Sequence, residues 1–218
     1  FLYEGRGGQV LEDTVSVVGA EDGSAPYLLK KQVSTVASRL QMKRMRDRHG
    51  EFTAIPMRDI DGNFIGLQRL YADKKLQGTG VKMDGAHCIL GDLETAKRRY
   101  AAEGFATGAS IYLAEIEAGR GDEVAVVVTF NVDNLIKVLR AYSLRYPAWR
   151  FHNAADNDQW KDGHAGLLAA LEIHRDQDLK HLAVVPSFEA ATPEELASKP
   201  TDWNDYHCLF GLEATAKS

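Results

Sequence analysis

Arg98-Arg99-Tyr100-Ala101-Ala102-Glu103-Gly104-Phe105-Ala106-Thr107-Gly108 is the stretch of this chain that decides its fold. The pattern predicts a short strand ending near Ala102, followed by a glycine-containing turn and a helix. In an open α/β sheet, ligands bind at the edge formed by the carboxyl ends of the strands. Glu103 would lie on that edge. A plain turn with a solvated carboxylate has the same local sequence, so the later segments of the chain must distinguish the two.

Helical and strand-like segments alternate after residue 91, which is typical of a mostly parallel sheet flanked by helices. The apolar run at 124–128 is the clearest buried strand. The strand at 98–102 is less apolar than a central parallel strand, which predicts a short strand or one at the sheet edge. The remaining expected elements are strands at 149–155 and 182–185 and helices at 107–118, 131–146, 163–175 and near Tyr206.

A smaller α+β region precedes this alternation. Helix-forming residues over 27–48 predict one helix with a basic C-terminal end. Apolar alternation over 52–58 and 64–71, on either side of Asp61-Gly62-Asn63, predicts a β-hairpin. We therefore divide the chain into an N-terminal extension at 1–25, a basic α+β subdomain at 26–94 and an α/β domain at 95–218.

Charge is distributed unevenly along the chain, whose formal net charge is -5. Residues 26–99 contain 15 Lys and Arg against 8 Asp and Glu, whereas residues 101–218 contain 10 against 18. Lys and Arg neutralise phosphate groups, and carboxylates bind hard cations. The counts favour a polyanion-binding surface beside a metal site, although two solvated surfaces with uneven charge would give the same counts.

The composition, with 44% hydrophobic and 26% charged residues, is that of an ordinary globular protein. Its longest apolar runs are far too short to span a membrane, and no charged-then-apolar leader opens the chain, so we expect a cytoplasmic protein without a membrane partner. Cys88 and Cys208 form no Cys-x-x-Cys pair, which argues against a zinc site or a disulfide framework. The chain starts at Phe1 rather than at a methionine, which we interpret as a fragment of a longer protein.

Two further acidic clusters follow predicted strands, as Glu103 does. Asp156 and Asp158 come directly after the strand at 149–155, and Asp202 and Asp205 follow the strand at 182–185 and a proline-containing loop. Because each cluster follows a strand of the same sheet, we expect all five carboxylates to converge on an oxygen-rich site for one or two Mg²⁺ or Mn²⁺ ions. Each cluster alone has a simpler explanation, since turns are rich in Asp and Asp202 would serve equally as a helix cap.

The residues around these acids resemble the Toprim domain of plasmid- and phage-type DNA primases. The resemblance covers roughly residues 26–211. In the region before Glu103, the predicted hairpin, the Lys-containing loop and Gly91 also look like that family. Its most specific segments are Ala102-Glu103-Gly104-Phe105-Ala106-Thr107-Gly108, Phe130-Asn131 with Asn134-Leu135, Ala154-Ala155-Asp156-Asn157-Asp158 and Asp202-Trp203-Asn204-Asp205.

This resemblance implies a fold, a site and an activity. The fold is a Rossmann-like Toprim sheet, mostly parallel and flanked by helices, preceded by a smaller α+β subdomain. Glu103 would act as general acid or base at the reacting phosphate, while Asp156 and Asp158 would bind Mg²⁺ and the cluster from Asp202 to Asp205 would add to the metal site. The activity would be Mg²⁺- or Mn²⁺-dependent synthesis of short RNA primers on single-stranded DNA from ribonucleoside triphosphates.

Basic side chains of the N-terminal subdomain are the candidates for holding template or triphosphate, namely Lys74, Lys75, Lys82 and Arg69. The zinc-binding and helicase modules that usually accompany such primases are absent from this sequence, so a helicase or other domains of a longer parent protein are expected partners. Toprim domains also occur in topoisomerases and nucleases. A metal-dependent nuclease and a non-catalytic nucleic-acid-binding module therefore stay open as alternatives.

Overall fold

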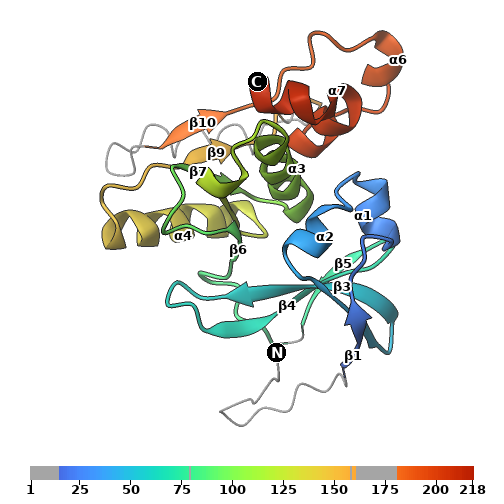
Figure 1. Ribbon diagram of the computed structural model, residues 1–218, viewed down its shortest axis with the longest axis vertical. Coiled ribbons are helices and arrows are strands. Elements are labelled where there is room, and N and C mark those ends of the chain that lie inside the picture. The colour runs from blue at the N-terminus through green and yellow to red at the C-terminus, as the bar shows by residue number, and fades with distance from the viewer. Residues whose placement is uncertain (1–14, 79, 158, 161–180) are drawn as a thin grey trace.

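The computed structural model describes residues 15–78, 80–157, 159–160 and 181–218. Within these ranges the chain forms two five-stranded sheets with helices packed between and around them (Figure 1). The N-terminal sheet lies below in that view and the second sheet above it. In the described part of the chain, no helix combines the length and the apolar character that crossing a membrane would require.

The N-terminal sheet is an antiparallel meander in which each strand pairs with the next one along the chain. The predicted hairpin is confirmed, and its turn is held by Asp59, whose Oδ1 accepts a hydrogen bond of 2.9 Å from the backbone N–H of Asn63. The strands are β1 (Ser16–Ala20), β2 (Lys43–Asp47), β3 (Gly50–Arg58), β4 (Phe64–Leu70) and β5 (Lys75–Gln77).

The single helix predicted over 27–48 is wrong. The region forms two short helices, α1 (Pro26–Lys30) and α2 (Val36–Arg39), and then strand β2. Gln32 and Gln41 follow the two helices with φ of 54° and 50°, a left-handed conformation that interrupts a right-handed helix. Pairing of β2 with β1 and β3 then outweighs the helix propensity of its basic residues.

The second sheet has the strand order β10-β9-β7-β8-β6. Its first four strands run parallel, and β6 pairs antiparallel with β8, so the predicted mostly parallel sheet is confirmed. Strand β7 is short, as expected, but lies in the centre rather than at the edge. The strands are β6 (Cys88–Gly91), β7 (Arg98–Ala102), β8 (Val124–Val128), β9 (His152–Ala154) and β10 (Leu182–Val184).

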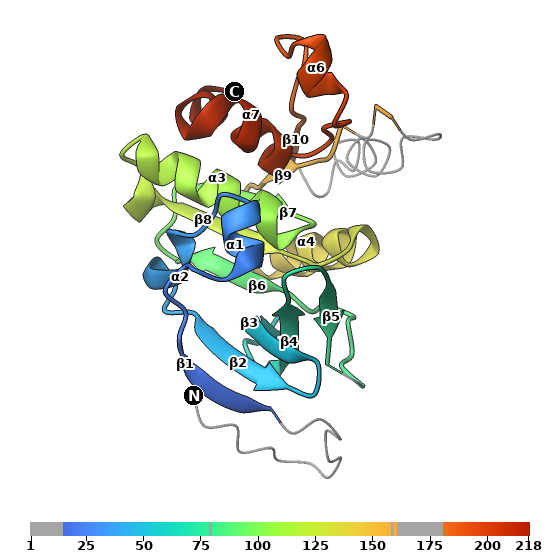
Figure 2. The same ribbon diagram turned by 90° about the vertical axis from the view of Figure 1, so that its right-hand side faces the viewer.

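Helices cover both faces of the second sheet. Figure 2 shows α7 stacked on α3 on one side of the sheet and α4 on the other. Gly108 lets α3 approach the sheet, because a Cβ there would lie 2.6 Å from Cγ2 of Val128. The predicted helix at 163–175 lies outside the described residues. The helices of this part are α3 (Phe105–Glu117), η1 (Gly121–Glu123), α4 (Val132–Arg145), α6 (Pro193–Leu196) and α7 (Trp203–Lys217).

One apolar core joins the two sheets. Leu28 of α1 and Ile55 of β3 belong to the same buried cluster as Phe105 of α3, Val126 of β8 and Trp203 of α7. Burial of each such side chain contributes about 1.5–3 kcal/mol. A backbone bridge adds to this connection, because Arg58 at the end of β3 and His87 just before β6 exchange hydrogen bonds of 2.8 and 2.9 Å. The N-terminal sheet is thereby joined to the second sheet through this shared core, to which α1 and α2 contribute, and through the edge strand β6.

Candidate functional site

Two of the predicted acids, Glu103 and Asp156, lie beyond the carboxyl ends of neighbouring parallel strands in the second sheet. Ala102, the last residue of β7, pairs with Ala154, the last residue of β9. Glu103 follows Ala102 directly, and Asp156 lies two residues beyond Ala154. Both acids are half-buried. The edge predicted from the sequence therefore carries Glu103 and Asp156 at the ends of neighbouring strands.

The backbone that carries Glu103 is fastened to the end of β8. The N–H of Phe130 donates a 2.8 Å hydrogen bond to the carbonyl oxygen of Glu103, and the N–H of Thr129 donates a 3.0 Å bond to that of Ala102. Phe130 adopts φ of 70°, a left-handed conformation that is costly for a residue with a large side chain. The strained turn thus keeps the two strand ends joined where Glu103 enters helix α3.

Asp202 and Asp205 lie together at the N-terminus of α7. Oδ1 of Asp202 accepts a 2.8 Å hydrogen bond from the N–H of Asp205, and Oδ2 of Asp205 accepts a 2.9 Å bond from the N–H of Thr201. Burial, together with the negative charge of Asp205, raises the pKa of Asp202 above its ordinary value. Lys31 of the α1 end has its Nζ 4.0 Å from Oδ1 of Asp205. Asp202 caps the helix, as the alternative interpretation of the sequence expected, and Asp202 and Asp205 also form a negatively charged pair.

Asn157 connects the Asp156 loop to the α7 acids. Its backbone N–H donates a 2.7 Å hydrogen bond to the carbonyl oxygen of Thr201, and its Nδ2 donates a 2.8 Å bond to that of Pro186, just beyond β10. The loops after β9 and β10 and the residue preceding Asp202 are thereby fastened together. Sequence reasoning missed Asn157, although its position between two aspartates was a signal.

The chemistry of the donors fits a hard cation, because Glu103, Asp156, Asp202 and Asp205 all offer carboxylate oxygens. Asp158 lies outside the described residues. Across the ranges that the structure describes, no three His, Cys, Asp or Glu side chains are gathered closely enough to hold a metal ion by themselves. The structure thus places two pairs of acids beyond the carboxyl ends of the strands, Glu103 with Asp156 and Asp202 with Asp205. Their convergence on a shared ion stays a prediction.

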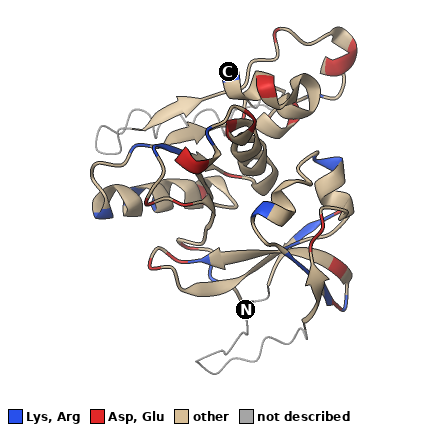
Figure 3. Cartoon of the chain, in the orientation of Figure 1, with Lys and Arg blue, Asp and Glu red and all other residues tan. Residues whose placement is uncertain are grey.

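The basic candidates of the N-terminal sheet fall into two kinds. Lys74, Lys75 and Lys82 are exposed, with Nζ of Lys74 lying 5.2 Å from the ring centre of Tyr71. Arg69 is buried, with 4% of its surface exposed, and is paired within the sheet. Figure 3 shows basic segments on α1, α2 and the lower sheet and acidic segments on α6 and α7. The exposed lysines are accessible to nucleic acid, whereas the charge of Arg69 is compensated inside the sheet.

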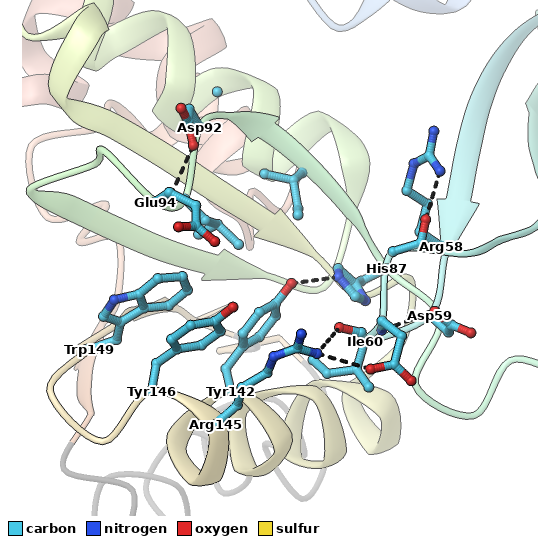
Figure 4. Close-up of a pocket in the computed structure, with 15 residues that line it drawn as sticks. Arg58, Asp59, Ile60, His87, Asp92, Glu94, Tyr142, Arg145, Tyr146 and Trp149 are labelled. Carbon is cyan, nitrogen blue, oxygen red and sulfur yellow. Dashed lines mark hydrogen bonds and ion pairs between the residues drawn. The ribbon is translucent and has the colours of Figure 1, made fainter. Parts of the chain in front are cut away.

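A cavity of about 390 Å³ lies between the β3–β4 turn and α4, on the opposite face of the sheet from α3 (Figure 4). Its polar side chains bond to one another. Nε2 of His87 lies 2.8 Å from the hydroxyl of Tyr142, and Arg145 donates a 2.9 Å hydrogen bond to Oδ1 of Asp61. Burial lowers the pKa of His87, which favours its neutral ring. We interpret this cavity as part of the junction between the two sheets and assign it no ligand.

Comparison with known proteins identifies the fold that carries these acids. The family model of the Toprim domain matches residues 98–213, more than half of the chain, and this match includes Glu103, Asp156, Asp202 and Asp205. The structure is also similar to the crystal structure of the primase fragment of the bacteriophage T7 primase-helicase protein, with a TM-score of 0.54 and 16% sequence identity. That similarity covers 84% of this chain and 69% of the T7 chain.

Proposed function

Because the chain belongs to the Toprim family, we propose that it is the catalytic core of a DNA primase, a nucleotidyltransferase that makes short RNA primers on single-stranded DNA. The observation that carries the proposal is the strand register that sets Glu103 beside Asp156. The likeness to the T7 primase fragment supports primase over nuclease. It covers 84% of the chain, and so extends beyond residues 98–213 into the N-terminal sheet.

In the proposed reaction, the 3′-hydroxyl of the growing primer attacks the α-phosphorus of a ribonucleoside triphosphate, a new P–O bond forms and pyrophosphate leaves. Glu103 accepts the proton of the hydroxyl as general base. Asp156 and Asp158, together with Asp202 or Asp205, would hold Mg²⁺ or Mn²⁺. The bound ions would neutralise the phosphate charge. Asn157 keeps the Asp156 loop beside the α7 acids through its bonds to Thr201 and Pro186.

The exposed lysines 74, 75 and 82 contact the phosphates of the single-stranded template or of the triphosphate. Arg69 is left out of this set because its side chain is buried. The reaction takes place in the cytoplasm, where a replicative helicase or other domains of a longer parent protein would deliver the single strand. In this proposal the N-terminal sheet supports the template and the second sheet carries the reaction site.

Substitution of the acids tests the reaction. The chain is incubated with single-stranded DNA, ribonucleotides and Mg²⁺ or Mn²⁺, and labelled RNA is measured. We expect Glu103→Gln and Asp156→Asn each to reduce product by about 100-fold or more, the usual contribution of a positioned proton acceptor or metal site. Glu117→Gln is the matched control, because Glu117 is exposed at the other end of α3.

The outcomes of this experiment distinguish the alternatives. Normal RNA synthesis by both variants would show that the assigned site is wrong. Shortened DNA without any need for ribonucleotides would indicate a nuclease that uses the same acids on water. Binding of DNA with neither product would indicate a non-catalytic module.

Removal of two lysines tests the template surface. We expect the double variant Lys74→Ala, Lys75→Ala to bind single-stranded DNA more weakly and to lower the slope of log affinity against log salt by up to about 1.4, since each phosphate contact on a single strand contributes about 0.7. Fluorescence anisotropy over a salt series measures this slope. Lys217→Ala, at the far end of α7, is the control. An unchanged slope in the double variant would assign these lysines to ordinary solvated surface.

A further inference from the structure

A second cavity, of about 430 Å³, lies beside the acidic edge. Its walls come from the loop after β9, the loop after β10 and helix α6, and combine apolar side chains with the polar side chains of Asn157, Gln159, Ser187 and Glu189. Phe188 on one wall is buried and packs against Tyr206 of α7, with ring centres 5.9 Å apart. The side chains used in the argument are Asn157, Trp160, Val185, Pro186, Phe188 and Leu196.

Asn157 ties this cavity to the acidic edge. It is the residue after Asp156, it lines the cavity, and its Nδ2 donates the 2.8 Å hydrogen bond to the carbonyl oxygen of Pro186, which also lines the cavity. A ligand whose phosphate lay at the carboxylate edge would therefore have the cavity directly beside it. A nucleotide has this combination, because its charged phosphate is joined through a sugar to a flat base with an aromatic face and polar edges.

Trp160 presents an indole to the cavity in a defined orientation. Its Nε1–H donates a 3.0 Å hydrogen bond to the carbonyl oxygen of Pro200, yet 43% of the residue is exposed. The other two tryptophans are packed: Trp149 stacks on Tyr146 with ring centres 3.9 Å apart, and Trp203 is buried in the core. Within the described residues, no aromatic ring packs on Trp160.

We propose that this cavity binds a nucleobase, stacked on Trp160, of either the incoming nucleotide or the template strand; this inference rests on the proposed function. The cavity falls within the usual size range of small-molecule sites, about 300–1,000 Å³. Stacking on an aromatic side chain accepts any base, because every base offers a π-face. Asn157, Gln159 and Ser187 supply polar atoms for the edge of the base.

The test measures binding by the full chain in the presence of Mg²⁺, using ATP, an oligothymidylate and inorganic triphosphate as probes. We expect Trp160→Ala to weaken binding of ATP or of the oligonucleotide by about 5- to 100-fold, the usual effect of removing one base-stacking side chain. Inorganic triphosphate, which has no base, should bind the variant as it binds the wild type. Leu182→Ala is the control, since Leu182 has a similar exposure at the opposite end of β10.

Two further variants separate stacking from simple packing. Trp160→Phe keeps an aromatic plane and should retain most of the affinity, whereas Trp160→Leu keeps apolar volume without the plane and should lose it. Loss confined to ATP assigns the cavity to the incoming nucleotide, and loss confined to the oligonucleotide assigns it to the template. Wild-type affinity of Trp160→Leu for both base-containing probes would overturn the proposal, as would an equal loss for inorganic triphosphate.

The binding measurement is independent of the primer-synthesis assay. If Glu103→Gln and Asp156→Asn still made RNA, the assigned reaction site would fail while a base-dependent loss in Trp160→Leu would still establish the cavity as a base site. If those variants were inactive and Trp160→Leu bound every probe normally, the reaction site would stand and the base site would fail.

Discussion

The carboxylates of the N-terminal sheet and those at the start of α7 differ in what neutralises them. Within the sheet, the side chains of Glu21 and Asp47 are fully buried. Each has its own arginine, at 2.8 Å for Arg44 with Glu21 and at 2.5 Å for Arg69 with Asp47. At α7, Asp202 and Asp205 lie beside each other, and the Lys31 ammonium is 4.0 Å from the nearest oxygen of Asp205.

The pKa values follow the same division. Burial by itself raises the pKa of Asp47, but hydrogen bonds from Tyr71, from the backbone N–H of His49 and from Arg69 outweigh it, so the pKa lies below the ordinary 3.8. The pKa of Asp202 is instead raised, first by burial and then by Asp205. The sheet carboxylates are therefore structural ion pairs with a built-in counter-charge, whereas the α7 acids are suited to a cation from outside.

The largest expected effect is on the buried ion pair of the sheet. Arg69→Leu should lower the free energy of unfolding by about 3–5 kcal/mol at pH 7, because it leaves Asp47 charged and buried with only the Tyr71 hydroxyl and the His49 N–H. Urea denaturation measures the loss. Arg46→Leu is the matched control, since Arg46 pairs with Glu51 in the same sheet but both side chains are exposed. That change should cost under about 1 kcal/mol.

Acidification distinguishes the contribution of the Arg69 charge to stability from the contribution of its packing. The lowered pKa of Asp47 means that its stabilising contribution is present above pH 3.8 and is lost as the pH falls through the native value. Protonated Asp47 needs no arginine, so the stability difference between wild type and Arg69→Leu should narrow on acidification below pH 3.8. An equal difference at pH 7 and at acid pH would mean that Arg69 stabilises the sheet through packing alone.

The two regions also differ in how much of them the sequence predicts. The position of Glu103 directly after a strand was predictable, because the buried apolar strand at 124–128 and the glycine-containing turn after Ala102 indicate where strands lie and end. The role of Arg69 was not. Arg69 lies in a predicted strand, a few residues before the exposed lysines 74 and 75, so the sequence suggested that it was exposed as well. Its partner Asp47 lies 22 residues earlier, on a strand two positions away in the sheet. Side chains that meet across a sheet leave no local signal in the sequence.

Strand β2 shows the same limit at the level of secondary structure. Its residues 43–47 favour a helix locally, yet Met45 pairs with Phe52, and Arg44 bonds to Glu21, 23 residues earlier. These long-range contacts outweigh local propensity. Trp160 is a similar case, because its hydrogen-bond partner Pro200 lies 40 residues later. Local patterns thus predicted the strand ends, and the contacts that position the site required the fold.

The smallest expected effect concerns the α7 acids and tests whether they are suited to an outside cation. Asp202→Asn keeps a good N-cap for α7 but removes one charge from the pair with Asp205. In EDTA, the variant should unfold with a free energy equal to the wild type or higher by about 0.5 kcal/mol, because like-charge repulsion is relieved. With Mg²⁺ added, thermal denaturation should show a larger rise in Tm for the wild type than for the variant, since an ion that binds only the folded state stabilises it.

Glu213→Gln, exposed later in α7, should respond to Mg²⁺ as the wild type does. If Asp202→Asn were instead destabilised in EDTA and responded fully to Mg²⁺, the carboxylate of Asp202 would be a helix cap like any other, and the contrast with Asp47 would disappear.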